Sequence, residues 1–599
     1  MLPTSQAESA RAQASYELAD KEPHDDRAPP PSQRNNRDKI RCLDGLRGIA
    51  CLLVFNYHFL WPWTPSIMLG YGAFPPGAPE PYWGLHQLPI ICLLTRGRPM
   101  VAIFFAISGY VLCRHILRAI HERRLDAAYR SLSSSVFRRV FRLYIPPTVS
   151  MFLVAMLAQL GAFRPEDDIF MGRDSVYING TVTKLSLGTP CVNGTAVAGA
   201  PGVAEYLGLQ TSGYLYNTTG WDESLSLCVN ATSKEFGPSR TYSLLALAED
   251  EFRNLNGTDS DPGAKAVETY MQHYGDEYWP PYQGPVPLHT GNGTNMTLCD
   301  GTKVRNTTDF MLVQMGGSWE EHPFIHDNIT YAVQNFTRAY AEWANPFNFG
   351  HYHPRYDPHT FTIPMELRGS MFIYIFLLGT AALKAKYRLG IAGGLMAYSL
   401  HMSRWDMATF LGGTALSELD IRRSDEARSL GPPATGSQRQ KSASRDMALR
   451  YLGIVTALHF LSYPDAAAEY TPGFRTMAKW VPRYYIPLSG WMVYQSLGAL
   501  ILLPCVMRMP FLVSILEGRV AQYLGRISFS LYLVHGPILH SVGFWIMPRL
   551  FDYFGQPVGF VVGWTVLLTL TLYLANIWYK KVDLWSVTVG KRIERMVVY

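Results

Sequence analysis

One apolar segment near the start of the chain contains an acid, a guanidinium and an imidazole. These groups belong to Asp44, Arg47 and His58. Ionisable side chains are costly inside a membrane-spanning helix and usually serve a function there. An α-helix turns about 100° and rises about 1.5 Å per residue, so Arg47 and His58 would share nearly one face at depths about 16 Å apart. The segment therefore predicts one helix that carries a cation at one depth and a possible proton acceptor at another.

Ten apolar runs of spanning or near-spanning length would position these groups. The sequence predicts an all-α polytopic membrane protein with about ten transmembrane helices and a large glycosylated insert on the lumenal or extracellular side. The two runs near 389–419 are the shortest. The runs are 45–63, 100–117, 144–163, 368–384, 389–403, 406–419, 448–463, 487–507, 526–547 and 558–578.

Polar stretches divide the chain into five predicted parts. The first and last are cytosolic tails, and the first is expected to be disordered because it is polar and has no apolar run. A glycosylated insert separates a first membrane block of three helices from a second block of about seven, which contains a cytosolic linker near 420–447. The parts are the N-terminal tail 1–40, the first block 41–163, the insert 164–360, the second block 361–580 and the C-terminal tail 581–599.

Two independent features predict the same orientation. Every Asn-x-Ser/Thr sequon lies within the insert, which places the insert in the lumen or outside the cell. Basic residues gather between the second and third helices and again near 384–388, 422–445 and 580–595, where the topology expects cytosol. The sequons are Asn179, Asn193, Asn217, Asn230, Asn256, Asn292, Asn295, Asn306, Asn328 and Asn335.

This orientation predicts a multi-pass protein of the secretory pathway with both termini in the cytosol; endoplasmic reticulum, Golgi, vacuole and plasma membrane remain open. Arg96, Arg98 and Arg404 are exceptions to the charge rule.

An oxidising compartment favours one disulfide in the insert, and the remaining thiol could pair with Cys92. Spacing leaves the pairing open. The insert cysteines are Cys191, Cys228 and Cys299.

Four separated segments together resemble the acyltransferase 3 family of multipass membrane O-acyltransferases. The sequence LDGLRG at 43–48, followed by His58, resembles the N-terminal signature of that family. Residues 98–110 resemble its second helix, 139–142 its Arg-x-x-Arg element and 524–535 its penultimate-helix motif. The order of these segments is more specific than any one of them.

A fifth segment, 360–370, resembles the acidic start of the next membrane block in fungal-type members. Phe361 stands where a tryptophan is common, which keeps an aromatic ring at that position. The resemblance implies transfer of an acyl group, with acetyl expected, from acyl-coenzyme A to a hydroxyl of a sugar, lipid or small metabolite. It implies the lipid bilayer, acyl-coenzyme A and the acceptor as partners, with no nucleic acid and no permanently bound cofactor.

The first constellation suits that chemistry. A neutral imidazole has a pKa near 6.5, so His58 is expected to be the general base that takes the hydroxyl proton. Arg47 would stabilise the developing oxyanion or hold the donor, and Asp44 would orient it or cap the helix. Alternatively, Asp44 and Arg47 form a packing salt bridge and His58 is an ordinary interhelical hydrogen-bond donor.

Arg139 and Arg142 lie one helical turn apart at the predicted cytosolic boundary, where both can face the phosphates of the donor. Arginines at this position can instead anchor a helix to lipid phosphates. Glu366 and Arg368 could contact the acceptor or form a helix-start pair. Ser108, beside Gly109, is expected to pack closely, because a serine nucleophile would need a neighbouring base.

His535 precedes Gly536 and Pro537, where a bent backbone could open a cavity; a satisfied interhelical histidine is the alternative, and His540 is a weaker candidate. Three histidines of the insert, at 351, 353 and 359, lack a carboxylate or cysteine that would complete a known ligand pattern, so we expect no metal. Two other classes of function remain open. The protein could be a transporter of a glycan or lipid, which would also carry buried charges. It could instead be a receptor-like protein that works through the insert and has an inactive membrane domain.

Overall fold

The membrane blocks are built from helices that coincide with all ten apolar runs. The computed structural model describes residues 40–74, 80–165, 168–169, 173–178, 180–186, 288–291, 296–297, 303–304, 308–317, 322–323, 325, 329–347, 356–429, 437–482, 485 and 490–597. The first block contains α3 (Arg41–Leu60), α4 (Arg98–His121) and α5 (Leu125–Gln159). The second contains α11 (Thr362–Thr380), α12 (Ala385–His401), α13 (Trp405–Ser429), α14 (Ser437–Leu461), α15 (Arg475–Ala478), α16 (Trp491–Val506), α17 (Pro510–Leu516), α18 (Arg519–Ile538), α19 (Phe544–Trp578) and α20 (Leu584–Val597).

Four helical stretches of the described part are long and apolar enough to cross a membrane: 98–121, 125–159, 358–380 and 519–597. The pair α16 and α17, bent by 99°, makes a fifth if it is one span. The last stretch is interrupted at Gly555, whose φ of 74° breaks α19. These findings support a membrane protein, while ten spans stay a prediction.

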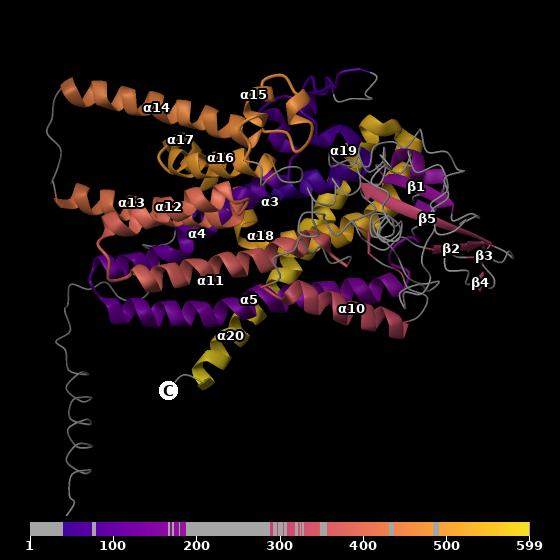
Figure 1. Ribbon diagram of the computed structural model, residues 1–599, viewed down its shortest axis with the longest axis horizontal. Helices are drawn as coiled ribbons and strands as arrows, with labels where there is room; N and C mark the ends of the chain where they lie inside the picture. Colours follow the sequence, from indigo (N-terminus) through magenta and orange to yellow (C-terminus); the bar gives the residue numbers. More distant parts are fainter. Residues whose placement is uncertain are drawn as a thin grey trace, which may run out of the picture. The chain divides into compact units, whose positions relative to one another are not determined.

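The helices of the two blocks pack against one another (Figure 1). Helix α4 contacts α5, α11, α13 and α16. The contact between α4 and α13 depends on two glycines, because a Cβ on Gly109 would lie 2.2 Å from the carbonyl oxygen of Phe410 and one on Gly413 would lie 2.3 Å from that of Ala106. Small residues let membrane helices approach closely. The close packing expected at Gly109 is thus present.

The all-α prediction is right for the membrane blocks, whereas the insert adds strands. Strands β1 (Gly180–Ser186), β5 (Thr308–Gly317) and β2 (Leu288–Gly291) form an antiparallel sheet in that order, and β3 (Met296–Thr297) pairs with β4 (Lys303–Val304). Helix α10 (Ile329–Ala344) packs on α5, where Trp343 and Phe336 join a core with Met151. Local hydropathy did not predict these strands, because a long polar sequence separates the segments that pair, β1 and β5.

Two predicted irregular segments contain helix. The linker expected near 420–447 is occupied by the end of α13 and the start of α14, with 430–436 outside the described residues. The expected C-terminal tail contains the amphipathic helix α20, which packs on α5. There, Ser134 donates a hydrogen bond to Glu594, and Arg138 lies 3.4 Å from the same carboxylate. Tertiary packing therefore orders a segment whose local composition is polar.

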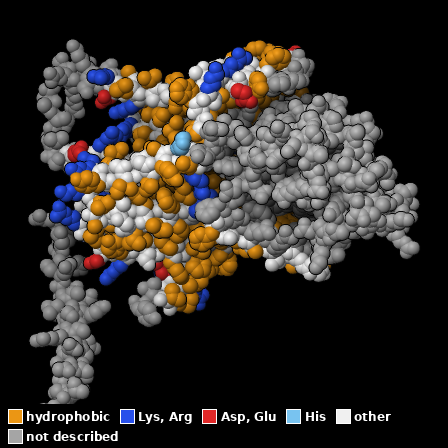
Figure 2. Space-filling model, viewed as in Figure 1, with side chains coloured by type: hydrophobic (Ala, Val, Ile, Leu, Met, Phe, Trp, Pro, Cys, Tyr) orange, Lys and Arg blue, Asp and Glu red, His pale blue; other side chains and the backbone are white. Residues whose placement is uncertain are grey.

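Surface chemistry matches a membrane environment. Figure 2 shows hydrophobic side chains over the helical surface and Lys and Arg side chains gathered at the end of the helices on the left of the view. Exposed basic residues of the α4–α5 turn and of the start of α12 include Arg123, Arg124, Lys384 and Lys386. This separation of charge from apolar surface is typical of a helical membrane protein.

The glycosylation and disulfide predictions fall on residues that are mostly outside the described part. Nine of the sequons are outside it, and Asn335 lies in α10 with its side chain outside the description. Cys191, Cys228 and Cys299 are also outside it, while Cys92 is a buried free thiol. Cys42, Cys51 and Cys113 are likewise buried and reduced, and Cys505 is reduced and partly buried.

Candidate active site

Helix α3 contacts α18 and the end of α17 through glycines. A Cβ on Gly45 would lie 1.9 Å from the carbonyl oxygen of Leu516, and one on Gly48 would lie 2.3 Å from the backbone nitrogen of Gly525. A Cβ on Gly525 would in turn lie 2.2 Å from the carbonyl oxygen of Asp44. No larger residue fits these positions without moving a backbone. The two glycines of the LDGLRG sequence therefore let the backbones of α3 and α18 meet.

This contact holds Arg47 between the two helices. Its NH2 group donates to Asp44 Oδ1 and to the carbonyl oxygen of Gly525, and its Nε donates to Ser528 Oγ, all at 3.1 Å. The side chains of Arg47 and Asp44 remain 37% and 26% exposed. The salt bridge considered for Asp44 and Arg47 is thus present, and enough of the guanidinium stays accessible to contact a ligand.

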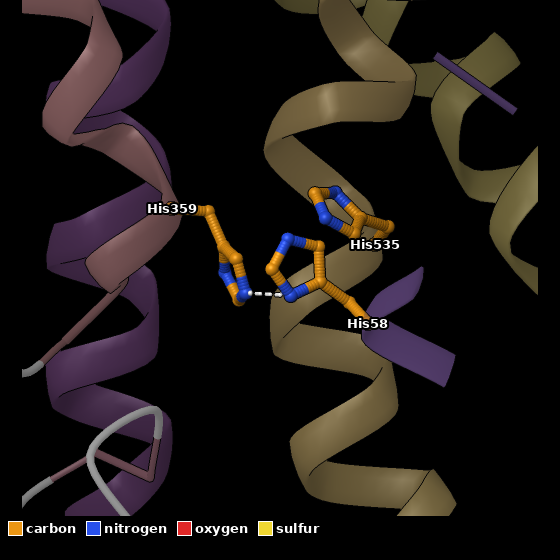
Figure 3. A group of neighbouring side chains, drawn as sticks. All are labelled: His58, His359 and His535. Carbon is orange, nitrogen blue, oxygen red and sulfur yellow. Dashed lines mark hydrogen bonds between the residues drawn. The ribbon is translucent and has the colours of Figure 1, made fainter. Parts of the chain in front are cut away.

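At the other end of α3, His58 meets His359 and His535 (Figure 3). The Nδ1 atom of His58 lies 2.9 Å from Nε2 of His359. The ring centroids of His58 and His535 are 5.2 Å apart, and those of His359 and His535 are 4.9 Å apart. One nitrogen from each ring lies within 4.8 Å of the others. Histidines from three distant segments therefore form one cluster.

The outer partners of two rings set their tautomers. Nδ1 of His535 lies 2.7 Å from the carbonyl oxygen of Tyr532 and 3.2 Å from that of Leu531. A carbonyl oxygen only accepts, so this Nδ1 carries the proton. Nδ1 of His359 lies 3.1 Å from Oδ1 of Asp357, and an ionised carboxylate also only accepts. In both neutral rings Nε2 is therefore the lone-pair nitrogen.

Asp357 is a buried carboxyl that immediately precedes the apolar stretch 358–380. Burial raises the pKa of this carboxyl, while the hydrogen bond and the charge of His359 act in the opposite direction. A carboxylate of higher pKa is a better proton acceptor. Asp357 therefore holds the Nδ1 proton of His359 and orients its ring.

The backbone of α18 is shaped to receive His359. A Cβ on Gly536 would lie 2.5 Å from Nδ1 of His359. Pro537 follows, and the chain continues as a π-helical turn, Leu539–Gly543, a distortion that is frequent at functional sites. Tyr532 also donates a hydrogen bond to the carbonyl oxygen of His359. The irregularity expected beside His535 is present, and it makes room for a second imidazole.

A second polar group joins α4, α5 and α11. Arg139 donates to Glu366 Oε1 at 2.5 Å and to Ser370 Oγ at 2.6 Å. Ser108 donates to the same Glu366 oxygen at 2.7 Å. Ser108 is thus a hydrogen-bond donor within this network as well as a small residue on α4. Glu366 holds Arg139 in one orientation.

Arg142 lies one turn beyond Arg139. The charges of Arg47, Arg139, Asp583 and Glu366 act on its guanidinium, although the residue itself is exposed. Arg47 and Arg139 thus act on Arg142, and these three guanidinium groups are accompanied by three carboxylates, those of Asp44, Glu366 and Asp583.

The structure separates two residues that were considered together. Glu366 contacts Arg139, whereas Arg368 lies 3.2 Å from Asp406, which also binds Arg404 at 2.8 Å. The suggested helix-start pair of Glu366 and Arg368 is therefore wrong. Residues two positions apart point to nearly opposite faces of a helix, so each side chain meets a different partner.

Several site residues were missed from the sequence. His359 contacts both His58 and Asp357. Asp583 lies in the π-helical turn Tyr579–Asp583, where Ser530 donates a hydrogen bond to it. His359 immediately precedes the fifth motif segment at 360–370, which is the one local signal for it. His540 is buried with its ring 6.2 Å from that of His359. Positions 351 and 353 lie outside the described residues.

Comparison with known proteins indicates an acyltransferase. A family model described as an acyltransferase domain, of the acyltransferase 3 type, matches residues 40–181, a range that includes Arg47, His58, Arg139 and Arg142. The O-acetyltransferase PaAT-1 of Phomopsis amygdali is 24% identical over 92% of this chain and 83% of its own length. Acyltransferase clz18 of Cochliobolus lunatus is 22% identical over 92% of this chain and 94% of its own length.

No solved structure matches the chain. The matched domain carries the Arg47 and His58 constellation, and the fungal relatives named as acyltransferases cover most of the chain. The chain is therefore similar to the acyltransferase 3 family over residues 40–181, and it is an acyltransferase.

Proposed function

We propose that this protein is a membrane O-acyltransferase that moves an acetyl group from acetyl-coenzyme A to a hydroxyl of a sugar, lipid or small metabolite. The observation that carries the proposal is the 2.9 Å contact between His58 Nδ1 and His359 Nε2, with Asp357 behind His359. The name of the relative, O-acetyltransferase PaAT-1, supports acetyl as the group and oxygen as the acceptor atom.

The three residues define a proton path. Asp357 accepts a hydrogen bond from Nδ1–H of His359, and Nε2 of His359 accepts a hydrogen bond from Nδ1–H of His58, so neutral His58 keeps its proton on Nδ1. Nε2 of His58 is left as the basic nitrogen. It takes the acceptor's proton as the hydroxyl oxygen attacks the thioester carbonyl. When the tetrahedral intermediate collapses, the carbon–sulfur bond breaks. The proton that His58 took from the hydroxyl then passes to the departing thiolate of coenzyme A.

The arginines are proposed to hold the donor. Coenzyme A carries phosphates, and charge-assisted hydrogen bonds from guanidinium groups bind phosphate strongly. Arg142 is exposed, and Arg139, which Glu366 holds in place, acts on it electrostatically. Arg47 lies on the same helix as His58, about 16 Å away by helical rise. The donor would therefore extend from Arg139 and Arg142 past Arg47, with its thioester near His58.

His58→Ala tests the base. Detergent-purified protein is incubated with labelled acetyl-coenzyme A and an extract of lipids, glycans and metabolites, and labelled ester is measured by mass spectrometry. We expect loss of transfer in His58→Ala and retention in His401→Ala, an exposed histidine of α12. His58→Ala protein that folds and transfers at the wild-type rate would refute the role of this imidazole.

The same proposal places the insert 164–360 in the lumen or outside the cell, in the secretory pathway, with both termini in the cytosol. Acetyl-coenzyme A would enter from the cytosolic side and the acceptor from the other. Removal of N-linked glycans from protein expressed in a fungal host should increase its gel mobility. Unchanged mobility after this treatment, while a glycosylated control protein from the same host responds, would contradict this topology.

A further inference from the structure

The cluster of His58, His359 and His535 has the composition of a transition-metal site. Imidazole nitrogen is a preferred ligand of zinc, copper and nickel ions, and three imidazoles with an open fourth position form a familiar zinc site. One ligand nitrogen from each ring lies within 4.8 Å of the other two. Ligands bound tetrahedrally at about 2.0–2.1 Å lie about 3.3 Å apart, so small side-chain rotations would complete the geometry.

The outer partners of the cluster also match a metal site. Metal-bound histidines usually donate their other ring N–H to a carboxylate or a backbone carbonyl. His359 does so to Asp357 at 3.1 Å, and His535 does so to the carbonyl oxygens of Tyr532 and Leu531. These contacts direct Nε2 of both rings inward. Both rings are buried, so burial adds to their fixed orientation.

We propose that His58 Nδ1, His359 Nε2 and His535 Nε2 bind one divalent ion of the zinc class. The ligands come from α3, from the turn before α11 and from α18, so the ion would tie three segments together. This replaces the expectation, drawn from the sequence, that no metal is bound. That expectation considered only neighbouring positions in the insert, whereas these ligands are supplied by positions 58, 359 and 535.

Metal binding and base catalysis exclude each other at this site. An ion on Nδ1 of His58 forces the proton of the neutral ring onto Nε2, which then has no lone pair for the acceptor hydroxyl. It also occupies Nε2 of His359. The ion would therefore inhibit transfer, and this consequence, unlike the binding itself, rests on the proposed function.

Binding is tested without any activity assay. The detergent-purified full chain is treated with a chelator, dialysed and titrated with Zn²⁺ by calorimetry and with Co²⁺ by visible absorption. We expect one equivalent of each metal, with the visible bands of a four-coordinate Co²⁺ ion. His535→Gln and His359→Gln should each weaken Zn²⁺ binding at least tenfold, whereas His401→Gln, which changes an exposed histidine outside the cluster, should bind like wild type.

Folding is controlled by thermal unfolding of the same samples. A ligand that binds only the folded state raises the unfolding temperature, so Zn²⁺ should raise it for wild type and His401→Gln but not for folded His535→Gln. Zn²⁺ binding of unchanged strength in both His535→Gln and His359→Gln would overturn the site. A saturating ion that leaves acetyl transfer unchanged, or increases it, would overturn the inhibition alone.

The two proposals fail in different ways. Transfer by His58→Ala with intact Zn²⁺ binding by wild type would refute the base and keep the metal site. Absence of Zn²⁺ binding by wild type, with transfer lost in His58→Ala, would refute the metal site and keep the base.

Discussion

Nδ1 of His58 and Nε2 of His359 lie 2.9 Å apart, although 301 positions separate the two residues along the chain. His58 lies in the last turn of α3, and His359 lies in the short helical turn before α11. The carboxyl of Asp357 is on the far side of His359. This alignment of a carboxyl and two imidazoles leads to the first prediction.

His359→Ala should lower kcat for acetyl transfer by about 10²–10⁴, the range that general acid–base catalysis contributes. The substitution removes the group that fixes the tautomer of His58. Asp357→Asn should cause a smaller loss, because the amide has the same size and its oxygen can still accept from Nδ1 of His359. Some loss is expected because the amide NH2 group can turn toward Nδ1 instead. Initial rates with labelled acetyl-coenzyme A measure both. Wild-type kcat in folded His359→Ala would rule out the proton path.

Arg142→Ala should raise the KM for acetyl-coenzyme A about tenfold or more, because a hydrogen bond to a charged group contributes about 1.5–3 kcal/mol. The matched control is Arg138→Ala. Arg138 has a side chain 42% exposed and is 3.4 Å from Glu594 of α20, away from the polar group at Glu366. Equal KM values for the two variants would show that Arg142 does not hold the donor.

Gly536→Ala should abolish most activity while the protein remains folded. The added Cβ would lie 2.5 Å from Nδ1 of His359, so the imidazole has to leave Asp357 or the two segments must separate. Gly394→Ala is the control, because a Cβ at that position of α12 meets nothing within 4 Å, and it should stabilise the helix by up to about 1 kcal/mol. Activity per folded molecule, after size-exclusion chromatography, distinguishes them; a fully active Gly536→Ala protein would contradict this close approach.

Arg388→Met should lower the free energy of unfolding by about 3 kcal/mol, the lower end of the usual effect of breaking a buried ion pair, because Glu418 keeps its contact with His121 at 2.8 Å. Arg388 binds both oxygens of Glu418, at 2.7 and 2.8 Å, and both side chains are 3% exposed. The partly exposed pair of Arg422 and Glu426, 3.6 Å apart, provides the comparison, since Glu426→Gln should cost about 0–1 kcal/mol. Thermal unfolding in detergent tests this contrast, and equal shifts would show that the buried pair has no special role.

The sequence was informative where a property depends on neighbouring residues. Each of the ten apolar runs coincides with a helix, because burial of a continuous apolar segment favours helix wherever it occurs. The spacing of Asp44 and Arg47 predicted their salt bridge, and the motif segments predicted the family, which the comparisons support. Gly536 and Pro537 likewise indicated an irregular backbone beside His535.

Only the tertiary structure decided which distant side chains meet. His359 looked like one of several histidines of the insert, yet it contacts His58 because the turn before α11 packs against α18 at Gly536. Glu366 and Arg368 seemed a local pair, yet α11 turns them toward different helices. Hydropathy and motif spacing act along the chain, whereas these contacts depend on helix pairing between residues hundreds of positions apart, and that pairing is determined by packing.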